Sequence, residues 1–280
     1  MTPTPPSPPD RPAFDLAPGD DPMSWRLPLA ARLCAGSDTA PFLFGGTALA
    51  AAVTALEMSC GRPVAWATAQ YVGYVRPPAL IDIVVTPLAT GRQITQAVVR
   101  LAVEDRPAVV VSAALGLRAD PLTDQWVKAP AVPDPEQCPA VNHRNRYIPG
   151  VESWMDVRLA AGRFPTRDAS FGGRGDGIIC LWVKPEHADP TTHQMLSMIA
   201  DYMSVVCSHA LGGYATGNSL DNTVRFLGRE ASEWVLCRVL MEATHAGVAV
   251  VRSQIFSQGG RLLASATTSL ILRAAVDPHG

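Results

Sequence analysis

Charged side chains are scarce in this sequence, and neither sign is in clear excess. Only 17% of the 280 residues are charged, and 23 lysines and arginines stand against 25 aspartates and glutamates, for a net charge of −2. A protein that neutralises nucleic-acid phosphates usually carries a basic surplus, so we expect no nucleic-acid partner. Hydrophobic residues make up 48% of the chain, which supports a large folded core rather than a disordered chain.

The usual signatures of metal and cofactor sites are also missing. The six cysteines include no C-x-x-C pair and the six histidines show no metal-ligand spacing, so we expect reduced thiols and no metal. The glycine-rich segment 172–177 lacks the pattern of a dinucleotide or triphosphate loop, which predicts a flexible loop and no cofactor. A G-x-S-x-G elbow is absent from the sequence, which argues against a serine hydrolase of the α/β type.

The chain has no apolar run long enough to span a membrane. Its most apolar stretch, residues 43–59, contains Glu57, two glycines and two threonines, and it falls short of the roughly 20 apolar residues that a membrane span needs. The N-terminus, MTPTPPSPPDRP, has no basic start followed by an apolar run, as a secretory signal would. We therefore expect a disordered Pro-rich tail over residues 1–25 and a cytoplasmic protein.

The length of the chain suits two domains. Prolines cluster between residues 121 and 139, and they predict a linker over residues 119–150. This linker would separate an N-terminal domain over residues 26–118 from a C-terminal domain over residues 151–275 that carries the active site.

Both halves follow the same order, a long apolar helix and then strands. Gly45 and Gly46 introduce an alanine-rich helix that reaches Cys60, and a second helix is expected from residue 191 to residue 209. In the first half, the pattern predicts strands over residues 64–76, 80–88, 93–103 and 108–117. In the second half, it predicts strands over residues 178–184, 219–227, 233–241, 247–256 and 262–272.

The last strands of the two halves are similar, which indicates a duplication. VVVSAALGLR aligns with LLASATTSLILR and places Ser112 opposite Ser265, an interval of 265 − 112 = 153 residues. One helix and one short antiparallel sheet cannot bury all their apolar surface unless the sheet wraps the helix. Two copies that join their sheet edges solve this, and we expect an α+β protein with a ligand cleft between the halves.

Several short motifs follow one another along residues 42–273, and their order and spacing are informative together. They are Leu43-Phe44-Gly45-Gly46, Tyr74-Val75-Arg76-Pro77, Gly91-Arg92, His193-Gln194, Ala200-Asp201-Tyr202, Ser219-Leu220-Asp221, Arg225-Phe226 and Glu233-Trp234-Val235-Leu236. Together they resemble the thioesterase II family of acyl-CoA thioesterases. The resemblance implies a tandem (double) hotdog fold, in which each half is a long helix wrapped by an antiparallel sheet. It also implies hydrolysis of a fatty-acyl-CoA to free fatty acid and coenzyme A, and it suggests a homo-oligomer.

The same resemblance implies three catalytic positions. In the family, an Asp on the second helix, a Ser or Thr on the next strand and a Gln on the last strand hold a water against the thioester carbonyl. The matching residues are Asp201, Ser219 and Thr268, the last standing where Gln is usual. A histidine of the first-half strand is replaced near Thr68.

The residues themselves support a role for Asp201. It follows an apolar helical segment, so its carboxylate is costly to bury without a partner or a purpose. The alternative interpretation is an aspartate that faces solvent on an amphipathic helix. The duplication pairs Asp201 with Ala48, since 201 − 153 = 48, so only the C-terminal half offers a carboxylate at this position.

Two other functions compete with hydrolysis. A non-hydrolytic acyl-thioester-binding hotdog protein would fit the replacements at Thr68 and Thr268. A hydratase or dehydratase would need an Asp and His pair, but His209 lies 209 − 201 = 8 residues from Asp201, about 12 Å along a helix. Some basic residues could meet coenzyme A phosphates, although solvated loop charges are the simpler interpretation. They are Arg144, Arg146, Arg158, Arg163 and Arg167.

Overall fold

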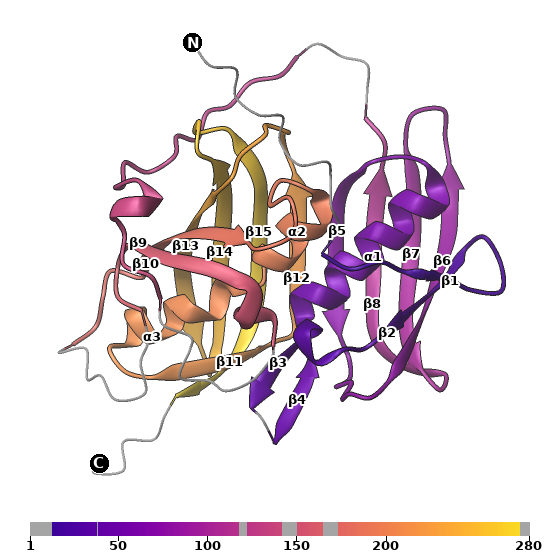
Figure 1. The fold of residues 1–280 in the computed structure, drawn as a ribbon, viewed down its shortest axis with the longest axis horizontal. Helices are drawn as coiled ribbons and strands as arrows, with labels where there is room; N and C mark the ends of the chain where they lie inside the picture. Colours follow the sequence, from indigo (N-terminus) through magenta and orange to yellow (C-terminus); the bar gives the residue numbers. More distant parts are fainter. Residues whose placement is uncertain (1–12, 38, 118–121, 142–149, 165–172, 275–280) are drawn as a thin grey trace.

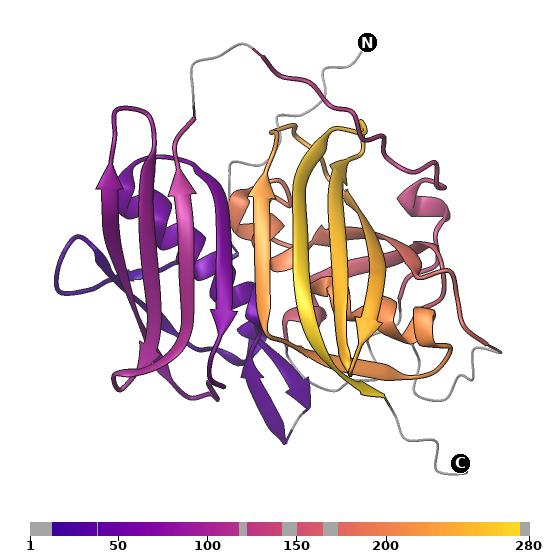
Figure 2. The same cartoon turned by 180° about the vertical axis from the view of Figure 1, so that it is seen from behind.

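The structure is a computed structural model that describes residues 13–37, 39–117, 122–141, 150–164 and 173–274. A 13-stranded antiparallel sheet runs across these residues, and the helices lie against one of its faces (Figure 1). Figure 2 shows the molecule from behind, with the strands in front of the helices. Three of the arginines considered for coenzyme A, Arg144, Arg146 and Arg167, lie outside the described residues, as does the tail over residues 1–12.

The first half is one long helix lying in the curve of its strands. Helix α1 (Gly45–Cys60) begins at the expected glycines, and ten of its sixteen residues are buried. The strands pair in the order β1-β2-β6-β7-β8-β5. Their bounds are β1 (Ala17–Pro18), β2 (Ser24–Pro28), β5 (Val64–Tyr71), β6 (Leu80–Thr90), β7 (Thr95–Val103) and β8 (Arg106–Leu115). A separate hairpin joins β3 (Cys34–Ser37) to β4 (Ala40–Leu43).

The second half repeats this plan with a broken helix. The helix expected from residue 191 to residue 209 is two helices, α2 (His193–Ile199) and α3 (Val205–Leu211). A 3₁₀ turn, η5 (Tyr202–Ser204), follows the break, which lies where Asp201 is hydrogen-bonded to α1. The strands pair in the order β12-β15-β14-β13-β10-β9, with β11 also on β15. Their bounds are β9 (Met155–Ala161), β10 (Ile178–Pro185), β11 (Ala215–Ser219), β12 (Asp221–Phe226), β13 (Val235–His245), β14 (Val248–Ser257) and β15 (Leu262–Ala274).

Strands β5 and β12 join the two halves into one sheet, as Figure 2 shows near its centre. Thr68 faces Thr223 across this junction, and their hydroxyl oxygens lie 2.9 Å apart. Thr68 also pairs with Ser112, and Thr223 with Thr267, so the halves are related by 223 − 68 = 267 − 112 = 155 residues. The interval is therefore 155 rather than 153, a slip of two residues that keeps every side chain on its expected face.

Part of the expected disordered tail belongs to the core. Phe14 and Leu16 are buried in the main hydrophobic core, because packing removes their apolar side chains from water. The side chain of Gln194 on α2 accepts a hydrogen bond from the N–H of Ala13 and donates one to the carbonyl of Phe14. The expectation of disorder is thus wrong for residues 13–25. No helix in the described part of the chain is long and apolar enough to cross a membrane.

Candidate active site

Asp201 lies between α2 and η5, at the junction of the two halves. Its Oδ2 accepts a hydrogen bond of 2.8 Å from the N–H of Gly46, at the start of α1. Its Oδ1 accepts bonds of 3.1 Å from Asn222 Nδ2 on β12 and 3.4 Å from Ser219 Oγ on β11. Three elements from both halves therefore hold one carboxylate in a fixed orientation.

The contact with Gly46 follows from how α1 begins. The first N–H groups of a helix have no partner within the helix and attract a negative charge. Gly46 also lacks the Cβ that would block the approach of α2, because such an atom would lie 2.7 Å from the Met198 carbonyl oxygen and 3.0 Å from Asp201 Cβ. With the interval of 155 residues, Gly46 is the counterpart of Asp201 (201 − 155 = 46). The carboxylate of Asp201 thus accepts a hydrogen bond from the residue at the equivalent position of the first half. That residue is Gly46 and not the expected Ala48.

Burial makes Asp201 a stronger base than an ordinary aspartate. Desolvation raises the pKa of Asp201 to about 6, and the hydrogen bonds from Asn222, Gly46 and Ser219 oppose this rise by stabilising the charged form. At neutral pH the group is still ionised. A carboxylate offers roughly four lone-pair sites, and these three bonds leave one on Oδ2.

Tyr71 is the neighbour that sequence reasoning missed. It ends β5 on the same face as the buried Ala67 and Ala69, and its hydroxyl is buried without a hydrogen-bond partner in the described structure. Burial, and next the negative charge of Asp201, raise the pKa of Tyr71 well above its usual value. The alternation of side chains along β5 could have indicated Tyr71, because it places this residue on the same face as Ala67 and Ala69. Thr68, the residue singled out on this strand, faces the opposite side and pairs with Thr223.

The three predicted catalytic residues are only partly brought together. Ser219 contacts Asp201, whereas the hydroxyl of Thr268 donates its hydrogen bond to the main-chain carbonyl of Asp221. Thr268 is buried on β15, and Asp221 Oδ1 also accepts a bond of 2.8 Å from the N–H of Ser269. Thr268 is thus hydrogen-bonded to the start of β12, the strand that carries Asn222, and it does not contact the carboxylate of Asp201.

The other titratable clusters lie apart from Asp201. His209 Nε2 contacts Asp176 Oδ1 at 2.9 Å, so the carboxylate that faces His209 belongs to the segment expected to be a flexible loop and not to Asp201. His193 Nδ1 lies 2.6 Å from Glu57 Oε1, which ties α2 to α1. Among the described residues, no group of three or more potential ligands could hold a metal ion.

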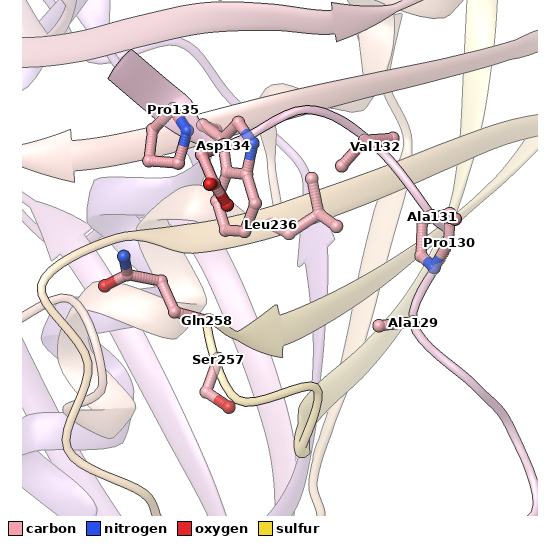
Figure 3. Close-up of a pocket in the computed structure, with 10 residues that line it drawn as sticks. Ala129, Pro130, Ala131, Val132, Asp134, Pro135, Leu236, Ser257 and Gln258 are labelled. Atoms are coloured by element: carbon pink, nitrogen blue, oxygen red, sulfur yellow. The ribbon is translucent and has the colours of Figure 1, made fainter. Parts of the chain in front are cut away.

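A shallow cavity of about 160 Å³ lies under the linker, away from this junction. Figure 3 shows Asp134, Ser257 and Gln258 among the residues that line it. None of the lining residues takes part in the hydrogen bonds to Asp201. Arg158, one of the arginines considered for coenzyme A, is bound to Asp156 at 3.0 Å.

Two helix-and-sheet halves joined at their edges, with one partly buried carboxylate at the joint, define a double-hotdog protein of the α+β class. The comparison with protein families agrees: residues 35–116 match the acyl-CoA thioesterase N-terminal domain, and residues 127–272 match the acyl-CoA thioesterase C-terminal domain. The chain belongs to the acyl-CoA thioesterase family, whose members are thioester hydrolases. The family, the fold class and the type of enzyme predicted from the sequence are thereby confirmed.

Solved structures extend this likeness over nearly the whole chain. A protein of Novosphingobium aromaticivorans described as a thioesterase is 29% identical, with 93% of this chain and 100% of that chain covered and a TM-score of 0.82. A hot dog protein of Alicyclobacillus acidocaldarius is 20% identical, with 94% and 97% covered and a TM-score of 0.80. The acyl-CoA thioesterase II TesB2 of Mycobacterium marinum is 17% identical, with 94% and 96% covered and a TM-score of 0.70. No curated protein matches the chain.

Proposed function

We propose that the protein hydrolyses a fatty-acyl-CoA to free fatty acid and coenzyme A, and that Asp201 activates the attacking water. The observation that carries this proposal is the geometry of Asp201, whose carboxylate is held by three hydrogen bonds from both halves with one lone pair on Oδ2 unused. Desolvation raises its pKa to about 6. A general base works best when its pKa lies near the working pH, and such bases contribute about 10²–10⁴ in rate. Ordinary aspartates are weaker bases.

The proposed reaction needs only the residues already described. Water gives a proton to Asp201 Oδ2 as its oxygen bonds to the thioester carbonyl carbon. The tetrahedral intermediate then collapses, the carbon–sulfur bond breaks, and the proton on Asp201 passes to the departing thiolate. Ser219 and Asn222 hold Oδ1, which keeps Oδ2 turned toward the reacting atoms, and Thr268 positions β12 through Asp221.

Thiol release from a panel of acyl-CoAs tests this function. We expect turnover with at least one class of short, medium or long acyl chains, measured with a thiol reagent on protein shown to be folded. The alternative is an acyl-thioester-binding protein that does not hydrolyse its ligand. Calorimetric binding of an acyl-CoA without thiol release from any chain length would support that alternative and refute hydrolysis.

The rate of hydrolysis should fall in acid. Because only the ionised carboxylate can accept a proton, we expect kcat/KM to be level above pH 7, to halve near pH 6 and to drop about tenfold per pH unit below. An initial-rate profile in buffers of constant ionic strength measures this. A decline of kcat/KM centred near pH 4 instead of pH 6 would contradict the role of the raised pKa.

Asn222→Leu provides the control for this assignment. The hydrogen bond from Asn222 lowers the pKa of Asp201, so its loss should move the acid limb upward by about one pH unit. A limb that stays in place would mean that the titrating group is not Asp201.

A further inference from the structure

Two buried polar atoms of the residues around Asp201 have no hydrogen-bond partner among the described residues, Asn222 Oδ1 and the Tyr71 hydroxyl. Of the two, only the hydroxyl can donate a hydrogen bond. It is fully shielded from solvent and has no partner among the described residues. Burying a hydroxyl without a partner destabilises the folded state, and phenylalanine would fill the same space without that cost. An unpaired hydroxyl at this position therefore calls for an explanation other than stability.

Tyr71 and Asp201 both pack closely against Gly45. A Cβ atom built on Gly45 would lie 2.7 Å from Asp201 Oδ2, 3.0 Å from Tyr71 Cζ and 3.1 Å from the Tyr71 hydroxyl oxygen. One small group placed there would touch both side chains at once. These distances are too short for a real Cβ atom, so only a glycine at position 45 lets Asp201 and Tyr71 both approach the start of α1.

Three donors around Asp201 are already used by its carboxylate. The Gly46 N–H, the Ser219 hydroxyl and the Asn222 amide all donate to the carboxylate. Hydrolysis of a thioester places negative charge on the carbonyl oxygen, and this oxyanion needs a donor about 3 Å away. Tyr71 has its hydrogen available, and burial together with the charge of Asp201 keeps it protonated.

We propose that the Tyr71 hydroxyl is a catalytic hydrogen-bond donor that stabilises the oxyanion on the thioester carbonyl. When water attacks the carbonyl carbon and gives its proton to Asp201 Oδ2, the carbonyl electron pair moves onto oxygen, and Tyr71 donates to that oxygen without losing its proton. When the carbon–sulfur bond breaks, the pair returns to re-form the carbonyl. This inference rests on the proposed function and adds the first-half residue that completes the site.

Tyr71→Phe tests the proposal, with Tyr202→Phe as its matched control. Tyr202 also has a buried hydroxyl without a partner, but burial and then Glu152 raise the pKa of Tyr202, and Asp201 is not among the causes. We expect Tyr71→Phe to lower kcat about 100-fold or more, with KM within about twofold because ground-state binding is kept. We expect Tyr202→Phe to keep the wild-type kcat.

Stability and a third variant separate a catalytic role from a structural one. Tyr71→Phe removes no hydrogen bond, so its Tm should equal or exceed that of the wild type. Gly45→Ala puts a methyl group against both side chains, and it should lose hydrolysis although Asp201 and Tyr71 are both present. Thermal denaturation and initial rates are measured on all the proteins.

Four results would overturn the proposal. They are a wild-type kcat in Tyr71→Phe, equal losses of kcat in Tyr71→Phe and Tyr202→Phe, a parallel drop in Tm and kcat in Tyr71→Phe, and full activity in Gly45→Ala. In each case the wild type still hydrolyses acyl-CoA, so the proposed function survives. Absence of thiol release from the wild type would instead overturn the proposed function and this inference with it.

Discussion

Replacing Asp201 with asparagine is expected to reduce hydrolysis about 10²–10⁴-fold, as removal of a positioned general base does. The amide is nearly isosteric and still fills the space between α1, β11 and β12, but it cannot accept a proton from water at any pH of interest. The loss should therefore appear in kcat, with the binding of acyl-CoA retained. Residual activity should also lack the acid limb near pH 6, because the group that titrates there is gone.

The same substitution is expected to stabilise the protein. The pKa of Asp201 rises from 3.8 to about 6 on folding, so the folded state binds more protons than the unfolded state between these values, and stability falls as pH rises through this window. Above pH 6 the full cost is about 3 kcal/mol. Asparagine avoids this cost but loses one acceptor, worth about 1 kcal/mol. We expect a net gain of about 2 kcal/mol at pH 7 that disappears toward pH 4.

Thermal denaturation at pH 7 and at pH 4 checks the sign. Asp176→Asn is the matched control, because the hydrogen bond from His209 lowers the pKa of Asp176. Its ionised form is favoured in the folded state, so its loss should not raise Tm, and hydrolysis should continue. An Asp201→Asn protein that is active, or that is less stable than the wild type at pH 7, would remove Asp201 from the centre of the site.

Features that depend on local sequence could be predicted. The alanine-rich run after Gly45 gave α1, because a continuous apolar segment of that length must be a buried helix. Asp201 was identified through the resemblance to known thioesterases and through the cost of placing a carboxylate after an apolar segment. The hydrogen-bond donor to this carboxylate on α1, the N–H of Gly46, cannot be predicted from local sequence, because the contact spans 155 residues.

Features that depend on register or on long-range packing were missed. A duplication interval of 153 points to Ala48, whereas the observed pairing of Thr68 with Thr223 gives 155 and points to Gly46. On β5 the inward side chain at the junction is Tyr71, and an alignment that stops at Thr68 selects the wrong face of the strand. The break after α2 was also missed, because a window of sequence does not show where another helix approaches.

Gly46→Ala is expected to cost both stability and activity. The new methyl group would lie 2.5 Å from Phe44 Cε1, 2.7 Å from the Met198 carbonyl oxygen and 3.0 Å from Asp201 Cβ. The last two atoms belong to or adjoin the backbone at the C-terminal end of α2, and they move only if α1 and α2 separate. We expect a loss of more than about 3 kcal/mol from overpacking, against which the better helix propensity of alanine returns only about 1 kcal/mol. A Tm lower by several degrees follows.

Activity should fall further than stability alone explains, because separating the helices displaces Asp201 from the reacting atoms. A shift of about 1 Å at a catalytic group costs about 100-fold in rate, and it should be measured well below the new Tm, where the variant is folded. Gly213→Ala is the control, since an added Cβ there meets no atom within 4 Å, and we expect it to match the wild type. If Gly46→Ala were as stable and as active as Gly213→Ala, α1 would not approach α2 closely enough for its first turn to hold the carboxylate. The site would then have to be rebuilt around a different contact.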